Sequence, residues 1–116
     1  GTQNLSRAVG ERRAKELILT GDVFTSQQAK DWGLVNRVCP TSELQSIVLE
    51  AACKIASNGP VAVRQAKQAI SRGMQMSLTD GLAFEIEAYN RTIPTQDRRE
   101  GVAAFNERRP PHFSGE

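Results

Sequence analysis

The stretch that begins at Ser77 constrains the fold most, because it contains two helix signatures separated by a break. Ser77 is a candidate N-cap for the first helix. Apolar residues follow it at the spacing of three and four that defines one helix face: Leu78, Leu82, Ile86, Tyr89 and Ile93. Pro94 disfavours the helical conformation in the residue before it, so the first helix is predicted to end there.

The second helix signature begins at Thr95, another candidate cap. Val102 and Phe105 mark its apolar side, and Pro110 and Pro111 stop it. Isolated helices of this length are marginal in water, because their stability in proteins comes mainly from packing of the apolar face. The sequence therefore predicts a pair of amphipathic helices that need a partner surface.

The residues before this block predict further helices and two short strands. Helices are expected from Thr2 to Val9, from Glu11 to Leu19, from Thr25 to Gly33, between Pro40 and Asn58, and from Pro60 to about Met74. Asp22–Phe24 and Leu34–Val38 are short and rich in apolar or β-branched residues, so both are predicted strands. Both precede Gly59 and only helices follow it, which suggests a boundary between residues 1–58 and residues 59–116.

Composition places the chain among globular domains and excludes several other classes. It has 116 residues, 39% hydrophobic and 24% charged, with a formal net charge of +2. This near balance gives no case for binding nucleic acid or an anionic membrane. No apolar run reaches the roughly 18 residues that a membrane span requires. Cys39 and Cys53 are not in a Cys-x-x-Cys pair, and two buried free thiols are expected.

No residue pattern predicts a catalytic centre or a metal site. His112 lies among prolines near the C-terminus and is expected at the surface. Glu85 lies beside the apolar stripe of its helix and is expected to be a buried, paired structural residue. One histidine and two isolated cysteines do not provide the ligand spacing of a metal site.

Phe105 and Arg108 are the best candidates for binding residues. They are three residues apart, so a continuous helix would place ring and guanidinium on one side. A phenyl ring can stack on adenine, and a guanidinium group can bind a phosphate. The alternative is that Arg108 belongs to an ordinary solvated face.

Four stretches of the chain resemble the C-terminal part of the enoyl-CoA hydratase/isomerase (crotonase) family, in order and without large gaps. They are Gly1-Thr2-Gln3-Asn4-Leu5-Ser6-Arg7; Thr20-Gly21-Asp22-Val23-Phe24 with the later Gly33-Leu34-Val35-Asn36-Arg37-Val38; Gly59-Pro60-Val61-Ala62 with Ala66-Lys67-Gln68-Ala69-Ile70; and Ala104-Phe105 with Glu107-Arg108-Arg109. The tail from Thr92 to Gly101 is most similar to the methylglutaconyl-CoA hydratase branch.

The resemblance implies an α/β crotonase-like fold, the ClpP/crotonase superhelix. This chain would be its mostly helical C-terminal portion with one or two short strands. Residues 1–58 would be the end of the spiral core. Residues 59–116 would be the helical domain that mediates oligomerisation and covers the active site.

The resemblance also implies a reaction on an acyl-CoA thioester. Family members stabilise an enolate with two backbone amides, and in hydratases two glutamates manage the water. Those groups match positions before Gly1, so no catalytic residue is expected in this chain. Phe105 and Arg108 match positions that bind coenzyme A in some members. No cofactor is implied, because coenzyme A is part of the substrate.

Several consequences and alternatives follow from the resemblance. The partners implied are an acyl-CoA thioester and copies of the same protein in a homotrimer or hexamer, including its N-terminal half. The compartment would be the cytoplasm in a bacterium or the mitochondrial matrix in a eukaryote. The alternatives are an enoyl-CoA isomerase and a non-catalytic helical oligomerisation module. RNA binding is known in the methylglutaconyl branch, but the near-neutral charge argues against it here.

Overall fold

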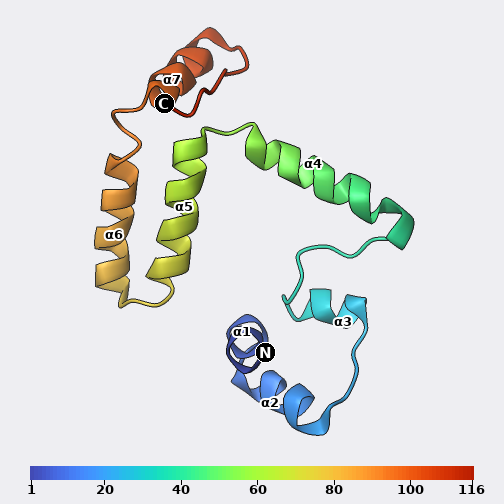
Figure 1. The fold of residues 1–116 in the computed structure, drawn as a ribbon. Coiled ribbons are helices and arrows are strands. Elements are labelled where there is room, and N and C mark those ends of the chain that lie inside the picture. Colours follow the sequence, from blue (N-terminus) through green and yellow to red (C-terminus); the bar gives the residue numbers. More distant parts are fainter. The chain divides into compact units, whose positions relative to one another are not determined.

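A computed structural model describes residues 1–116 as helices joined by turns and loops, with no β-strand (Figure 1). The elements are α1 (Thr2–Val9), α2 (Glu11–Thr20), α3 (Ser26–Asp31), the 3-10 turn η1 (Thr41–Glu43), α4 (Leu44–Ala56), α5 (Pro60–Gly73), α6 (Leu78–Asn90) and α7 (Gln96–Glu107). They form two compact units, Gly1–Gln45 and Ser46–Glu116. The division at residue 58 concerns the complete protein and stays a prediction.

Helices α3, α6 and α7 begin at side-chain caps, and the sequence predicts the caps of α6 and α7. Thr25, Ser77 and Thr95 each accept a hydrogen bond from the backbone N–H three residues further on. At α3 the interaction is reciprocal, because Gln28 Oε1 accepts a hydrogen bond from the Thr25 N–H at 2.8 Å. These side chains satisfy backbone donors that have no partner inside the helix, which fixes where each helix begins.

Both predicted strands are wrong. Neither Asp22–Phe24 nor Leu34–Val38 contains a strand residue or a ladder partner. The N–H of Leu34 donates instead to the Ala29 carbonyl oxygen at 2.8 Å, just after the left-handed Gly33 that ends the helix. Strand propensity becomes a strand only where a neighbouring strand supplies hydrogen bonds, and residues 1–116 supply none at these segments.

The unit Gly1–Gln45 is held together by the packing of α1 against α2 and by the side chains that contact Trp32. Helices α1 and α2 contact one another, and Ala14 of α2 is fully buried. The Trp32 ring lies 5.3 Å from the Phe24 ring, measured between centroids. Trp32 has a second contact: the Arg13 guanidinium carbon lies 4.5 Å from the Trp32 ring centroid, a cation–π arrangement. Trp32 is therefore half-buried rather than at the centre of a core.

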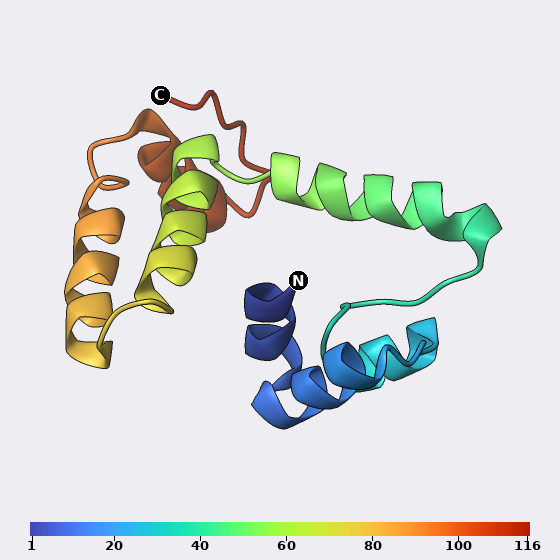
Figure 2. The same cartoon turned by 60° about the horizontal axis from the view of Figure 1, so that its bottom comes forward.

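In the unit Ser46–Glu116, α5 and α6 form an antiparallel hairpin (Figures 1 and 2). Glycines lie where the two helices approach at the closed end of the hairpin. A Cβ built on Gly81 would lie 3.6 Å from the Cα of Gly73, so little space separates the backbones. Ala88 is buried further along the same contact. Small residues thus allow the close packing of this pair.

Large apolar side chains remain exposed along these helices. The buried apolar residues are four alanines, Ala14, Ala29, Ala88 and Ala104. In α4, Leu44, Val48 and Ile55 are more than half exposed. Leu82 and Ile86 of α6 are 50% and 61% exposed. Residues 1–116 alone do not cover their own apolar faces.

Two further observations concern surface properties. None of the helices combines the length and the apolar character needed to cross a membrane. Cys39 and Cys53 are free thiols, as expected, but Cys39 is half-buried and Cys53 is exposed. The expectation that both are buried is wrong, because the α4 face that carries Cys53 has no covering element in residues 1–116.

Candidate functional site

The candidate site of the second unit is built from helix α7 and the segment after it. Arg108 ends the helix in the left-handed conformation, with φ 55° and ψ 39°. The N–H of Arg109 then donates to the Ala104 carbonyl oxygen at 3.0 Å, which closes the last turn. The chain reverses there, and residues 110–116, the C-terminal tail, run back along α7 (Figure 1).

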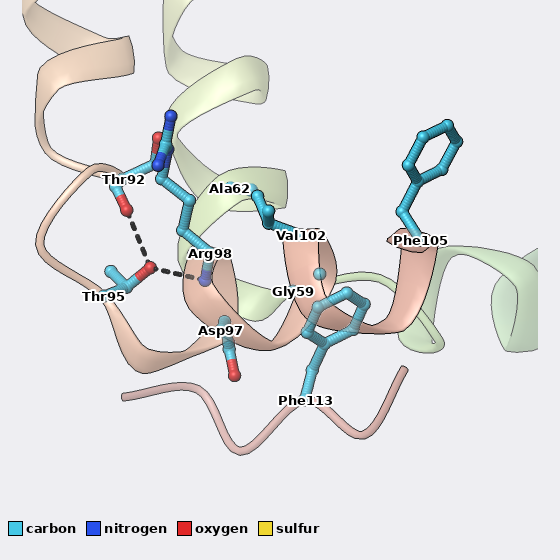
Figure 3. A pocket seen from close by; sticks show the side chains of 10 residues that line it. Gly59, Ala62, Thr92, Thr95, Asp97, Arg98, Val102, Phe105 and Phe113 are labelled. Atoms are coloured by element: carbon cyan, nitrogen blue, oxygen red, sulfur yellow. Dashed lines mark hydrogen bonds between the residues drawn. The ribbon is translucent and has the colours of Figure 1, made fainter. Parts of the chain in front are cut away.

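A hollow of about 360 Å³ lies among the start of α5, the turn before α7, α7 itself and the C-terminal tail (Figure 3). Its lining is mostly apolar and consists of Gly59, Ala62, Thr92, Thr95, Asp97, Arg98, Gly101, Val102, Phe105 and Phe113. Phe105, Phe113, Val102 and the Arg98 side chain therefore border the same space. This combination suits a flat, partly polar group such as a heteroaromatic ring.

Phe113 forms one side of the hollow by covering two glycines. A Cβ built on Gly59 would lie 3.7 Å from Phe113 Cδ1. A Cβ built on Gly101, inside α7, would lie 3.6 Å from Phe113 Cε1. Both distances are ordinary van der Waals contacts for the added atom, so the ring faces the backbone at both positions with room for about one methyl group between them.

Asp97 holds the end of the C-terminal tail. The residue is only 5% exposed. Its Oδ1 accepts a hydrogen bond from the Ser114 N–H at 2.7 Å, and its Oδ2 accepts one from the Gly115 N–H at 3.0 Å. The backbone N–H groups of Gln96 and Asp97 donate to the Glu116 carbonyl oxygen at 2.6 and 3.1 Å. The tail thus donates hydrogen bonds to the Asp97 carboxylate, and the first turn of α7 donates hydrogen bonds to the Glu116 carbonyl oxygen of the tail.

Glu100 holds the other end of the tail. The Arg109 guanidinium forms two hydrogen bonds with its carboxylate, at 2.5 and 2.8 Å, and the His112 N–H donates to Oε1 at 2.8 Å. The hydrogen bonds from Arg109 and, to a smaller extent, from His112 lower the pKa of Glu100 from 4.5 to about 2. The same pairing, with a second contact to Glu107, raises the pKa of Arg109.

Acid titration should report on this ion pair. Because the pKa of folded Glu100 is depressed from 4.5 to about 2, its stabilising effect is fully present above pH 4.5. The effect is lost as the pH falls through about 2, so stability should decline across that window. Glu100→Gln should remove this part of the pH dependence of the thermal unfolding midpoint, measured on the complete protein. Glu85→Gln, which removes an exposed carboxylate without an ion pair, should keep it. Parallel curves for wild type and Glu100→Gln would show that the pair is not formed in solution.

The two predicted binding residues lie near each other in sequence but not on one helix face. Phe105 is 84% exposed and borders the hollow. Arg108 is exposed too, but it follows the last helical residue and is not among the residues that line the hollow. The same-face argument is therefore wrong for Arg108, because its left-handed backbone ends the helical periodicity. Binding of coenzyme A by the pair stays a prediction.

Sequence reasoning missed Arg98 and Asp97. Arg98 borders the hollow, with its guanidinium turned toward Thr92 and away from Phe113 (Figure 3). Its Nη2 lies 3.5 Å from the Tyr89 hydroxyl. An arginine pair such as Arg98–Arg99 is usually solvated, and an acidic residue in the first turn, such as Asp97, is favoured by the helix dipole alone. No local pattern indicates the tail contacts of Asp97, which join residues 17 and 18 positions apart.

The remaining candidates behave as surface residues. His112 is exposed, as predicted, and takes part through its backbone N–H. Glu85 is exposed as well, so the expectation of a buried and paired glutamate is wrong. The reason is that the α5–α6 groove beside it is open within residues 1–116. No group of three or more histidine, cysteine, aspartate or glutamate side chains is placed to hold a metal ion.

Comparison with known proteins agrees with this architecture. The sequence model of the enoyl-CoA hydratase/isomerase family matches residues 1–116. The chain is 48% identical to a short-chain-enoyl-CoA hydratase of Clostridium acetobutylicum over 109 residues, which is 94% of this chain and 42% of that protein. It is 44% identical over 120 residues to human mitochondrial methylglutaconyl-CoA hydratase, covering all of this chain and 35% of that protein.

A crystal structure of an enoyl-CoA hydratase from Bacillus anthracis matches the fold with a TM-score of 0.97 and 52% identity. The match covers 99% of this chain and 45% of that chain, so residues 1–116 span less than half the length of these relatives. The expectation of a helical C-terminal portion of the crotonase fold is confirmed, apart from the strands. The family match over every residue establishes that the chain belongs to the enoyl-CoA hydratase/isomerase family.

Proposed function

We propose that the chain is the C-terminal part of an acyl-CoA-processing enzyme, and that the complete protein hydrates a 2-enoyl-CoA through an oxyanion-stabilised enolate. The observation that carries this proposal is the 48% identity to a short-chain-enoyl-CoA hydratase over 94% of the chain. Family membership alone also admits an enoyl-CoA isomerase, since the family description names both activities.

The reaction itself is assigned to the part of the protein outside residues 1–116. No serine, cysteine or histidine arrangement for nucleophilic catalysis is formed here, and the glutamates Glu11, Glu16 and Glu43 match no catalytic position of the family. The contribution of residues 1–116 is instead to bind the substrate's remote end and to provide surfaces for assembly. Hydration of crotonyl-CoA by the complete protein, followed as loss of the enoyl thioester absorbance, tests the proposal. Movement of the double bond without uptake of water would favour the isomerase.

The end of α7 is the proposed site for the nucleotide end of coenzyme A. The Phe105 ring is 84% exposed, an unusual state for a phenyl group unless another surface or a ligand covers it. Arg108 follows it with a guanidinium group that no hydrogen bond or ion pair engages. Adenine and the 3′-phosphate of coenzyme A supply an aromatic face and a charge to match them.

Arg108→Gly tests the phosphate contact without disturbing the helix end. Glycine adopts the left-handed conformation of this position readily, so the substitution removes the guanidinium and favours the observed backbone. We expect the KM for crotonyl-CoA to rise by about five- to thirtyfold, since an exposed charged hydrogen bond is worth roughly 1–2 kcal/mol. The kcat should change little, because the contact is remote from the reacting carbon.

Two controls separate binding from structure. A substrate truncated to its pantetheine arm lacks adenine and the 3′-phosphate, so wild type and Arg108→Gly should handle it alike. Arg99→Ala removes another exposed arginine of α7 and should leave both substrates unaffected. An equal loss on the full and the truncated substrate would mean that Arg108 does not contact the nucleotide.

Assembly and compartment are proposed on the same basis. The exposed apolar residues of α4 and α6 are surfaces that a homotrimer or hexamer of the complete protein would cover. Bacterial and mitochondrial relatives support the bacterial cytoplasm or the mitochondrial matrix as the compartment. An acyl-CoA thioester is the substrate class in either case.

A further inference from the structure

We propose that Asp97 is a positioning residue for the hollow beside α7. It fixes the C-terminal tail along α7, and Phe113 of that tail forms one wall of the hollow. The role rests on the function proposed above, because the group that the wall would contact is the adenine end of the acyl-CoA. Phe113 would then limit the space for that ring opposite Val102 and Phe105.

The first argument is the state of the Asp97 carboxylate. It is 5% exposed, and no lysine, arginine or histidine forms an ion pair with it. A buried carboxylate without a cation is costly unless hydrogen bonds stabilise its charge. Here the stabilising groups include the N–H donors of Ser114 and Gly115, at 2.7 and 3.0 Å. The position of this part of the tail therefore depends on the charge of Asp97.

The second argument is the placement of Phe113 between two anchors. His112, just before it, donates its N–H to Glu100 at 2.8 Å, and Ser114, just after it, donates its N–H to Asp97. The tail forms no regular secondary structure, so these side-chain acceptors take the place of a helix or strand ladder. Releasing the Asp97 carboxylate removes the acceptor next to the ring on one side, where only the backbone bonds to the Glu116 carbonyl oxygen then remain.

The Phe113 ring covers the backbone at two glycines, Gly59 and Gly101. Gly59 is buried, and the atoms nearest to a Cβ built there belong to Asp97 and Phe113, at 3.5 and 3.7 Å. At Gly101 the nearest atoms to an added Cβ also belong to Phe113, at 3.6 and 3.8 Å. Without the tail, the hollow would lose this side and open to water (Figure 3). The shape of the hollow therefore depends on the docking of the tail against α7.

The test uses the complete protein and two readouts. Asp97→Asn keeps the size of the side chain but removes its charge and places an amide donor opposite a backbone donor. We expect the Ser114 and Gly115 amides to exchange with deuterium at least about tenfold faster. We also expect the KM for crotonyl-CoA to rise roughly three- to tenfold with kcat unchanged, and the pantetheine substrate to be unaffected.

Asp80→Asn is the matched control. Asp80 also lies in the first turn of a helix behind a hydroxyl cap, so it shares the favourable position at the helix dipole. Its carboxylate accepts from the Ser77 hydroxyl and has no bond to the tail. Asp80→Asn should leave tail exchange and both KM values unchanged. Faster tail exchange in this variant too would indicate a general loss of stability and overturn the assignment to Asp97.

Phe113→Ala tests the role of the Phe113 ring separately from the role of Asp97 in holding the tail. This variant should raise the KM for crotonyl-CoA as Asp97→Asn does, while the Ser114 and Gly115 amides stay protected. Faster exchange in Asp97→Asn with an unchanged KM, or an unchanged KM in Phe113→Ala, would overturn the proposal. If the wild type does not hydrate crotonyl-CoA, the function proposed above fails. The Kd for coenzyme A then replaces KM, and equal Kd values for wild type and both variants overturn the positioning role.

Discussion

Residues 1–116 by themselves should leave crotonyl-CoA unconverted. The family resemblance implies that the enolate is stabilised by two backbone amides, that two glutamates move the protons, and that all of these groups match positions before Gly1. The one carboxylate that lines the hollow beside α7 is that of Asp97, and it already accepts hydrogen bonds from the Ser114 and Gly115 N–H groups. Loss of this electrostatic stabilisation removes most of the rate enhancement, because such groups usually supply its largest single part.

The measurement compares the purified chain with the complete protein under the same conditions, following the enoyl thioester absorbance. We expect the chain to match the uncatalysed rate and the complete protein to be active. Circular dichroism of the chain is needed beside it, to show whether its helices form in isolation. Turnover by the chain at about 1–10³ per second, the usual range of enzymes, would show that a catalytic group lies within residues 1–116.

Replacing both Leu82 and Ile86 with aspartate should abolish assembly of the complete protein. The two side chains are 50% and 61% exposed in residues 1–116 and lie one turn apart on α6. If copies of the protein cover this face, the variant would bury two unpaired carboxylates in an apolar contact. Each would cost several kcal/mol, which exceeds what most interfaces can absorb.

Light scattering coupled to size exclusion would give the mass of the assembly. Gln68→Asp with Ser71→Asp is a suitable control, because it adds two carboxylates at exposed polar positions of the neighbouring helix α5. This control should assemble as the wild type does. A double variant of Leu82 and Ile86 that keeps both its helix content and its full mass would mean that no subunit covers this face.

Local chemistry explains which parts of the fold could be predicted from the sequence. The caps at Ser77 and Thr95 depend on residues at most three positions away, and the sequence predicts both. The family resemblance was also readable, because motif order survives when individual residues change. These features need no knowledge of what the chain packs against.

Features that depend on distant partners could not be predicted. Leu34–Val38 has strand propensity, but a strand requires a neighbour that residues 1–116 do not supply. Arg108 ends α7 without the glycine that usually signals a left-handed helix end. Asp97 shows its role only through Ser114 and Gly115, after the tail has reversed direction.

The small size of the buried side chains determines where the stability of this half of the protein originates. An alanine contributes one methyl group, so four buried alanines provide little hydrophobic free energy against the entropy of ordering seven helices. Local caps fix where three of the helices begin, while large apolar side chains stay exposed. Any surface that covers those side chains in the complete protein should therefore add to the stability of residues 1–116.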